Sequence, residues 1–159
     1  MKQFLNKLIL NPIVKKFFKV NLLLLFPIAN ENDYKLIYQK AKNRKFEEID
    51  IFENKKKFKI DAQWLDNLAL YTQVVKKKSL INYQHGRVLY STLKDYLKKN
   101  KFEKINIFET GTARGFSSIV MSKVLNENNQ RGKIFTIDIL PNNKKMYWNC
   151  LLDNDGKKT

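Results

Sequence analysis

The stretch from Ile105 to Asp138 constrains the fold more than any other part of this 159-residue sequence. It reads INIF, ETGTARG, a helical period over 116–126, a polar loop, and then GKIFTIDI before Pro141. Two short apolar runs separated by a glycine-containing turn and a helix predict a strand–turn–helix–strand unit. The two strands of such a unit pair in parallel through a right-handed crossover. We therefore expect an α/β fold with strands at 105–108 and 133–139.

The turn after the first strand and the acid that ends the second one indicate a nucleoside-containing ligand. Glycines between a strand and a helix N-terminus let a ligand approach the backbone, and Gly111 lies there. Asp138, at the end of the next strand, can accept hydrogen bonds from ribose hydroxyls. The three-glycine fingerprint of dinucleotide-binding proteins is absent, because Ala113 and Phe116 replace its second and third glycines. The pattern therefore argues against NAD.

The spacing acid-x-Gly-x-x-x-Gly-x-Ser, from Glu109 to Ser117, resembles that of the class I S-adenosylmethionine-dependent methyltransferases. Within that class, the O-methyltransferase branch of the catechol and caffeoyl-CoA enzymes is similar in two further segments. QHGRVL at 84–89 looks like its helix before the first strand, and GKIFTIDI looks like its second strand. The resemblance covers residues 84–141. It implies a Rossmann-like methyltransferase fold, S-adenosylmethionine as cofactor, and a small-molecule or saccharide hydroxyl as methyl acceptor.

The resemblance also implies a set of cofactor-binding residues. They are Glu109, Gly111, Thr112, Ala113, Gly115, Ser117 and Asp138. Gly111 and its neighbours would pass close to the methionine part of the cofactor, and Asp138 would hold the ribose hydroxyls. Glu109 would order the loop or meet the cofactor's amino group through water, and Ser117 would lie near its carboxylate. Ala113 stands where this branch often has glycine.

The sequence assigns neither a catalytic base nor a metal site. His85 is the single histidine and Cys150 the single cysteine, which excludes a multi-histidine metal site and a cysteine-based zinc site within this chain. We interpret His85 as a surface or helix-start residue, although its place in the matching segment puts it near the cofactor pocket. The tryptophans and tyrosines are interpreted as core or subunit contacts, which is compatible with a homodimer.

Two helices are expected before the first strand. Asp61 can cap a helix that continues to about Val75 and is closed by the lysines at 76–78. A second helix is expected over 84–99, with its inward side chains at Leu89, Leu93, Tyr96 and Leu97. Residues 31–60 read as a polar connection with a short helical pattern at 34–38 and an extended piece near 58–60. The predicted organisation is an N-terminal helical arm and connection over 1–60, and a cofactor-binding region that starts over 61–159.

Only 21 residues follow Asp138, and they contain no further strand pattern. A doubly wound sheet of two strands would leave apolar faces and edges uncovered. We therefore expect a fold truncated after its first strand–helix–strand unit, with the remaining strands and the acceptor site in sequence beyond these residues.

The charge is strongly basic, with 31 Lys and Arg against 15 Asp and Glu and a net charge of +16. Such a charge suggests an anionic partner. However, arginine, which recognises phosphate and guanine through two parallel hydrogen bonds, occurs only at positions 44, 87, 114 and 131. The lysine excess is typical of AT-rich coding sequence and argues against nucleic acid as partner. The alternative function is a noncatalytic basic module that binds nucleic acid or an anionic membrane surface.

Residues 1–30 mix apolar side chains with lysines. Their longest uncharged run, from Val20 to Asn30, is shorter than the ~20 residues that span a bilayer. They fit a helical arm packed on the domain or on a partner subunit, or a segment in peripheral contact with an anionic membrane. Pro27-Ile28-Ala29 makes a poor secretory cleavage site. We expect a cytoplasmic protein, with membrane association as the alternative that this segment leaves open.

Overall fold

The computed structural model describes residues 27–140 and 145–155 of the chain. The interpretations of residues 1–30 fall almost wholly outside this range, so the helical arm and the peripheral membrane contact stay predictions. Within the described residues, no helix combines the length and the hydropathy needed to cross a bilayer.

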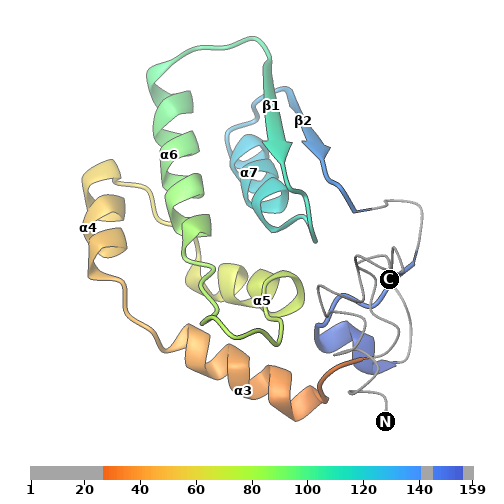
Figure 1. Ribbon diagram of the computed structural model, residues 1–159. Coiled ribbons are helices and arrows are strands. Elements are labelled where there is room, and N and C mark those ends of the chain that lie inside the picture. Colours follow the sequence, from red (N-terminus) through yellow and green to blue (C-terminus); the bar gives the residue numbers. More distant parts are fainter. Residues whose placement is uncertain (1–26, 141–144, 156–159) are drawn as a thin grey trace. The chain divides into compact units, whose positions relative to one another are not determined.

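The chain divides into two compact units, which are described separately. The first comprises Met1–Lys42, Val74–Ile81 and Asn142–Thr159, and the second comprises Asn43–Gln73 and Asn82–Pro141. The described elements of the first unit are α3 (Glu31–Lys42) and the short 3-10 helix η1 (Leu151–Asp155). Those of the second unit are α4 (Glu47–Lys56), α5 (Ala62–Thr72), α6 (His85–Lys99), β1 (Ile105–Thr110), α7 (Phe116–Glu127) and β2 (Gly132–Ile137) (Figure 1).

Hydrogen bonds to Asn149 tie together the three segments of the first unit. The Tyr34 hydroxyl of α3 donates to Asn149 Oδ1 at 2.9 Å, and Asn149 Nδ2 donates to the Lys76 carbonyl oxygen at 2.6 Å. The buried carboxylate of Asp153, in η1, accepts the backbone N–H of Cys150 at 3.0 Å. These bonds satisfy polar groups that would otherwise be costly to bury.

The second unit contains a two-stranded parallel sheet. Ile105 of β1 pairs with Gly132 of β2, and Thr110 pairs with Ile137. α7 joins the strands and covers one face of the sheet (Figure 1). Its buried residues are Phe116, Val120, Met121, Val124 and Leu125. The predicted α/β unit is confirmed, although β1 extends two residues further than expected and β2 ends two residues earlier.

Gly132 is required at the start of β2 by its close approach to β1. A Cβ atom at this position would lie 2.6 Å from the Ile105 carbonyl oxygen, which is too near for any side chain. The chain therefore leaves the polar loop after α7 and enters the sheet at the one residue type that fits this contact.

The start of α5 agrees with the sequence prediction and its end does not. The Asp61 side chain accepts the backbone N–H of Trp64 at 2.6 Å, which confirms the predicted N-cap. The helix ends at Thr72 rather than at the lysines 76–78. The physical reason is the fully buried Val74, which belongs to the core of the first unit and leaves the helical path to reach it.

The predicted bounds of α6 are confirmed, but its buried face is rotated from the expected one. Gly86, Tyr90 and Ser91 are buried, whereas Tyr96 is 47% exposed. The helix packs against α4 on one side and α7 on the other, so its buried stripe is set by two neighbours instead of one. The Ser91 hydroxyl is satisfied there by the Phe58 carbonyl oxygen at 2.7 Å.

The short helical pattern predicted at 34–38 is confirmed, since it lies within α3. The prediction that the rest of 31–60 is a polar connection is wrong, because most of it also forms α3 and α4. Both helices begin with acidic residues and end with lysines, which favours a helix through its dipole. α4 is fixed to α6 by Arg87, whose guanidinium bridges the carboxylates of Asp50 and Glu53. The extended piece expected near 58–60 forms no strand.

Candidate functional site

The candidate site lies at the carboxyl ends of β1 and β2. Because the strands are parallel, both ends meet at the same edge of the sheet. The Gly111–Gly115 turn follows β1 directly, and Asp138 follows β2 directly. Ligands of open α/β sheets bind at this edge, here called the ligand edge. The fold therefore brings together two segments that are more than twenty residues apart in the sequence.

The turn after β1 has an unusual run of left-handed backbone. Gly111, Ala113 and Gly115 have φ angles of 83°, 44° and 76°. The Gly111 N–H donates to the Ile137 carbonyl oxygen at 2.7 Å, and the Gly115 N–H donates to the Thr112 carbonyl oxygen at 2.7 Å. Among the described residues, no atom would lie within 4 Å of a Cβ at Gly111, so the backbone there borders open space. A ligand can reach the main chain at this point.

Asp138 is held against the turn by backbone hydrogen bonds. The Ala113 N–H donates to its Oδ2 at 2.6 Å, and the Leu140 N–H donates to its Oδ1 at 2.8 Å. These two bonds, with a third from the Ile139 N–H, lower the pKa of the Asp138 carboxyl below its ordinary value. The side chain is only partly exposed, and each carboxylate oxygen keeps a further lone pair. The Asp138 carboxylate, which can accept further hydrogen bonds, therefore lies at the ligand edge.

Glu109 lies on the face of the sheet that α7 covers. Its carboxylate accepts the hydroxyl of Ser118, in the first turn of α7. Ser118 is absent from the predicted site residues. The signal for it was available, because Gly115 is the N-cap of α7 and the third residue after a cap often reaches back toward the preceding turn. Glu109 and Ser118 thus join the end of β1 to the start of α7.

Ser117 and Thr112 contribute less to the geometry. Ser117 lies in the first turn of α7, partly exposed, and its hydroxyl makes no hydrogen bond to the other predicted site residues. Thr112 takes part through its carbonyl oxygen, which closes the turn onto Gly115. The structure therefore links the turn to Asp138 through a backbone N–H and Glu109 to α7 through Ser118. Among the described residues, the Ser117 hydroxyl has no hydrogen-bond partner.

His85 lies beside this turn. Its ring packs edge-on against the ring of Phe116, the first residue of α7, with 4.9 Å between the centroids. Partial burial lowers the pKa of His85, against a smaller opposing effect of a hydrogen bond that the imidazole donates to the Asn82 backbone carbonyl. The first residue of α6 is thus a neighbour of the turn through Phe116.

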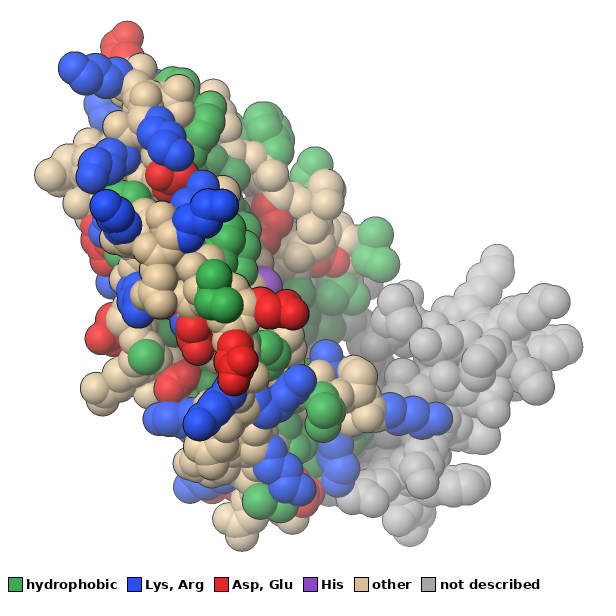
Figure 2. Space-filling model, turned by 90° about the vertical axis from the view of Figure 1, so that its left-hand side faces the viewer, with side chains coloured by type: hydrophobic (Ala, Val, Ile, Leu, Met, Phe, Trp, Pro, Cys, Tyr) green, Lys and Arg blue, Asp and Glu red, His purple; other side chains and the backbone are tan. Residues whose placement is uncertain are grey.

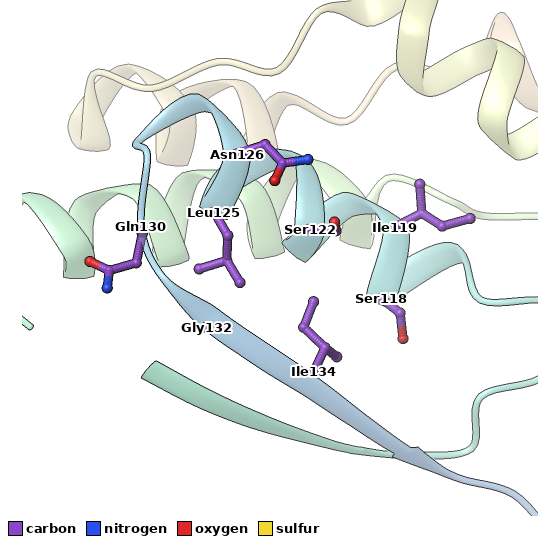
Figure 3. Close-up of a pocket in the computed structure, with 8 residues that line it drawn as sticks. All are labelled: Ser118, Ile119, Ser122, Leu125, Asn126, Gln130, Gly132 and Ile134. Atoms are coloured by element: carbon purple, nitrogen blue, oxygen red, sulfur yellow. The ribbon is translucent and has the colours of Figure 1, made fainter. Parts of the chain in front are cut away.

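A separate pocket of about 350 Å³ lies between α7 and β2 (Figure 3). It is lined by Ser118, Ile119, Ser122, Leu125, Asn126, Gln130, Gly132 and Ile134. None of the seven predicted cofactor-binding residues lines it. Ser118 is common to the pocket and to the Glu109 contact, but no residue of the Gly111–Gly115 turn lines the pocket.

Within the described part of the chain, no three histidine, cysteine or acidic side chains form a group that could hold a metal ion. Three comparisons of the chain, with protein-family models, with curated proteins and with solved structures, find no match.

Proposed function

We propose that the chain binds S-adenosylmethionine at the edge formed by the Gly111–Gly115 turn and Asp138, and that it is a methyltransferase of the Rossmann-like class I type. One observation carries the proposal. The carboxylate that ends β2 accepts the Ala113 N–H of the turn that ends β1. A strand-end acid beside a glycine turn at the start of a helix is an arrangement that binds nucleoside-containing cofactors in open α/β sheets.

The residues present fit such a cofactor. Asp138 offers acceptor lone pairs to the two ribose hydroxyls, and its backbone hydrogen bonds, which lower its pKa, favour the charged carboxylate. The open space at Gly111 admits the methionine part next to the backbone. Free N–H groups in the first turn of α7 favour its carboxylate, and Ser117 lies there with an available hydroxyl.

Glu109 acts as an ordering residue in this proposal. Its carboxylate is engaged by Ser118, which fixes where the turn leaves β1 and where α7 begins. Ala113 and Thr112 then present backbone groups at constant positions. When bound, S-adenosylmethionine supplies an electrophilic methyl group on a sulfonium sulfur. The proposed acceptor is a hydroxyl of a small molecule or a saccharide, and orientation of the two partners is the main contribution that a protein makes to such a transfer.

Calorimetric titration of the chain with S-adenosylmethionine and with its demethylated product tests the proposal. We expect saturable binding that Asp138→Ala weakens at least tenfold, because hydrogen bonds to a charged group contribute about 1.5–3 kcal/mol. Gly111→Arg should abolish binding by filling the open space. Glu103→Ala is the matched control, since it removes an exposed carboxylate elsewhere. Absence of binding to both compounds, or tighter binding of NAD, contradicts the proposal.

A further inference from the structure

The C-terminal ends of α4 and α6 carry a cluster of lysines that we call the lysine patch. Its members are Lys55, Lys56, Lys57, Lys59, Lys94, Lys98 and Lys99. The two helix ends meet, because Lys56 Nζ lies 2.7 Å from Asp95 of α6. Figure 2 shows Lys and Arg side chains gathered over the upper part of the face that includes these helices.

An aromatic ring forms the centre of the patch. Lys94 and Lys98 place their ammonium groups 6.0 and 5.5 Å from the centroid of the Phe58 ring. The Phe58 carbonyl oxygen is bound by Ser91 of α6, which fixes the segment between α4 and α5 on this helix. The lysines are therefore held on one surface by the packing of α4, its following segment and α6.

Most of the positive charge of the patch is left without a counter-charge. Asp95 pairs with Lys56 and Lys99, and Glu127 pairs with Lys94. Within residues 27–140 and 145–155, no carboxylate lies within ion-pair distance of the other four lysines. These are Lys55, Lys57, Lys59 and Lys98, and all four are exposed. A surface with this excess charge fits an anionic partner.

We propose that the lysine patch docks on a bilayer of anionic phospholipids. Two features favour a lipid surface over nucleic acid. The patch contains no arginine. It therefore lacks the planar guanidinium group that binds phosphate or guanine through two parallel hydrogen bonds, and it offers only the compact ammonium charges of lysine. Its aromatic ring is half-buried and overlaid by two ammonium groups, so it presents no free face on which a base could stack. Mobile lipid headgroups need neither feature.

Co-sedimentation of the full chain with phosphatidylcholine vesicles, with and without phosphatidylserine, tests this proposal. We expect binding only in the presence of phosphatidylserine, with a steep loss on addition of salt. The combined variant Lys55→Gln, Lys57→Gln, Lys59→Gln and Lys98→Gln should lower the partition coefficient roughly a hundredfold or more, since each lysine near an anionic bilayer contributes about fivefold.

The matched control removes the same charge from exposed positions outside the patch. It combines Lys40→Gln, Lys77→Gln, Lys78→Gln and Lys133→Gln, and it should bind nearly as well as the unchanged chain. A variant with arginine at the four patch positions keeps the charge and should retain binding, which separates charge from folding effects. Circular dichroism checks that all variants keep their helices.

Two results would overturn the proposal. One is equal loss of vesicle binding in the patch variant and its control, which would assign the effect to net charge alone. The other is binding of single-stranded RNA by the unchanged chain without binding to phosphatidylserine vesicles. Neither result bears on cofactor binding, because the patch and the Gly111–Gly115 turn share no residue.

Discussion

Ala113 occupies a backbone conformation that favours glycine. Its φ of 44° lies in the left-handed region, which costs a residue with a Cβ about 1–2 kcal/mol. Its N–H is the donor to Asp138, so the strained conformation is what aims this group at the carboxylate. Strain of this kind collects at ligand sites because the surrounding structure can hold it there.

Ala113→Gly should therefore raise the free energy of unfolding. Relief of the left-handed strain contributes about 1–2 kcal/mol, and the greater entropy of glycine in the unfolded chain removes about 0.5–1 kcal/mol, which leaves a gain of about 0.5–1 kcal/mol. Urea denaturation followed by circular dichroism measures it. Ala113→Val, with a branched side chain at the same φ, should destabilise instead. If both variants lowered stability, the turn would not hold strain at this position.

Gly86 decides how closely α6 approaches its neighbours. A Cβ atom there would lie 2.8 Å from Phe116 Cζ and 2.9 Å from Leu65 Cδ1. Gly86→Ala should lower the free energy of unfolding by about 1–2 kcal/mol, because overpacking outweighs the better helix propensity of alanine. Thermal denaturation tests it against Thr92→Ala, an exposed change on the same helix. Equal stability of the two variants would show that Phe116 moves aside freely.

The contact between α6 and α7 also contains a titratable side chain, Glu127, whose hydrogen bonds link the two helices. The Glu127 carboxylate accepts hydrogen bonds from Lys94, Tyr90 and Lys123 at the helix surfaces. Partial burial alone would raise the pKa of Glu127. The hydrogen bonds from these three side chains outweigh burial and lower the pKa to about 2.

This lowered pKa makes stability depend on pH in a defined window. The charged form of Glu127 is the one that is favoured on folding, so its contribution is complete above the ordinary value near 4.5 and is lost as the pH falls toward 2. Since the side chain is 31% exposed, we expect a loss of about 1–2 kcal/mol after solvent screening. Glu127→Gln should flatten this part of the stability curve, as measured by urea denaturation at several pH values. An unchanged slope in the variant would place the acid sensitivity elsewhere.

The unit from β1 to β2 could be predicted from sequence because local signals mark each boundary. Gly111, Gly115 and Gly132 end or begin its elements, and the side chains between them follow one period at a time. α4 lacked such a signal. Its sequence EEIDIFENKK has no clear apolar stripe, and its anchor is the pairing of Glu53 with Arg87, more than thirty residues away. Tertiary contacts of this kind are invisible to a local pattern.

The candidate site could be predicted in part, because local sequence signals mark some of its residues and tertiary contacts place the others. Asp138 and the glycines follow from strand ends and turn chemistry, whereas the Ser118 contact depends on which residue caps α7. Sequence favours Ser117 by its spacing to Gly115, but the left-handed Gly115 places the hydroxyl of Ser118 against Glu109. A difference of one residue on a helix changes the side-chain direction by about 100°.

At the scale of the second unit, the two faces of the sheet differ. α7 covers the face that carries Ile107 and Ile134, which are half-buried. On the opposite face, Phe108 is 74% exposed and Phe135 is 42% exposed, and their rings stack with centroids 5.0 Å apart. Ile137, in the same row, is 66% exposed. Apolar side chains that adjoin on one surface are more informative than scattered ones.

The combined variant Phe108→Thr and Phe135→Thr tests how much this face contributes to folding. We expect the free energy of unfolding to fall by only about 1 kcal/mol, because the stacked pair is worth about 0.5–1.5 kcal/mol and little further area is buried. Fluorescence of a bound apolar dye should drop markedly, since its binding surface is removed. Val120→Thr, a polar change at a fully buried position of α7, should instead destabilise the chain by more and increase dye binding. A large loss of stability in the phenylalanine variant would mean that the face is covered in solution, because exposed rings have little burial energy to lose.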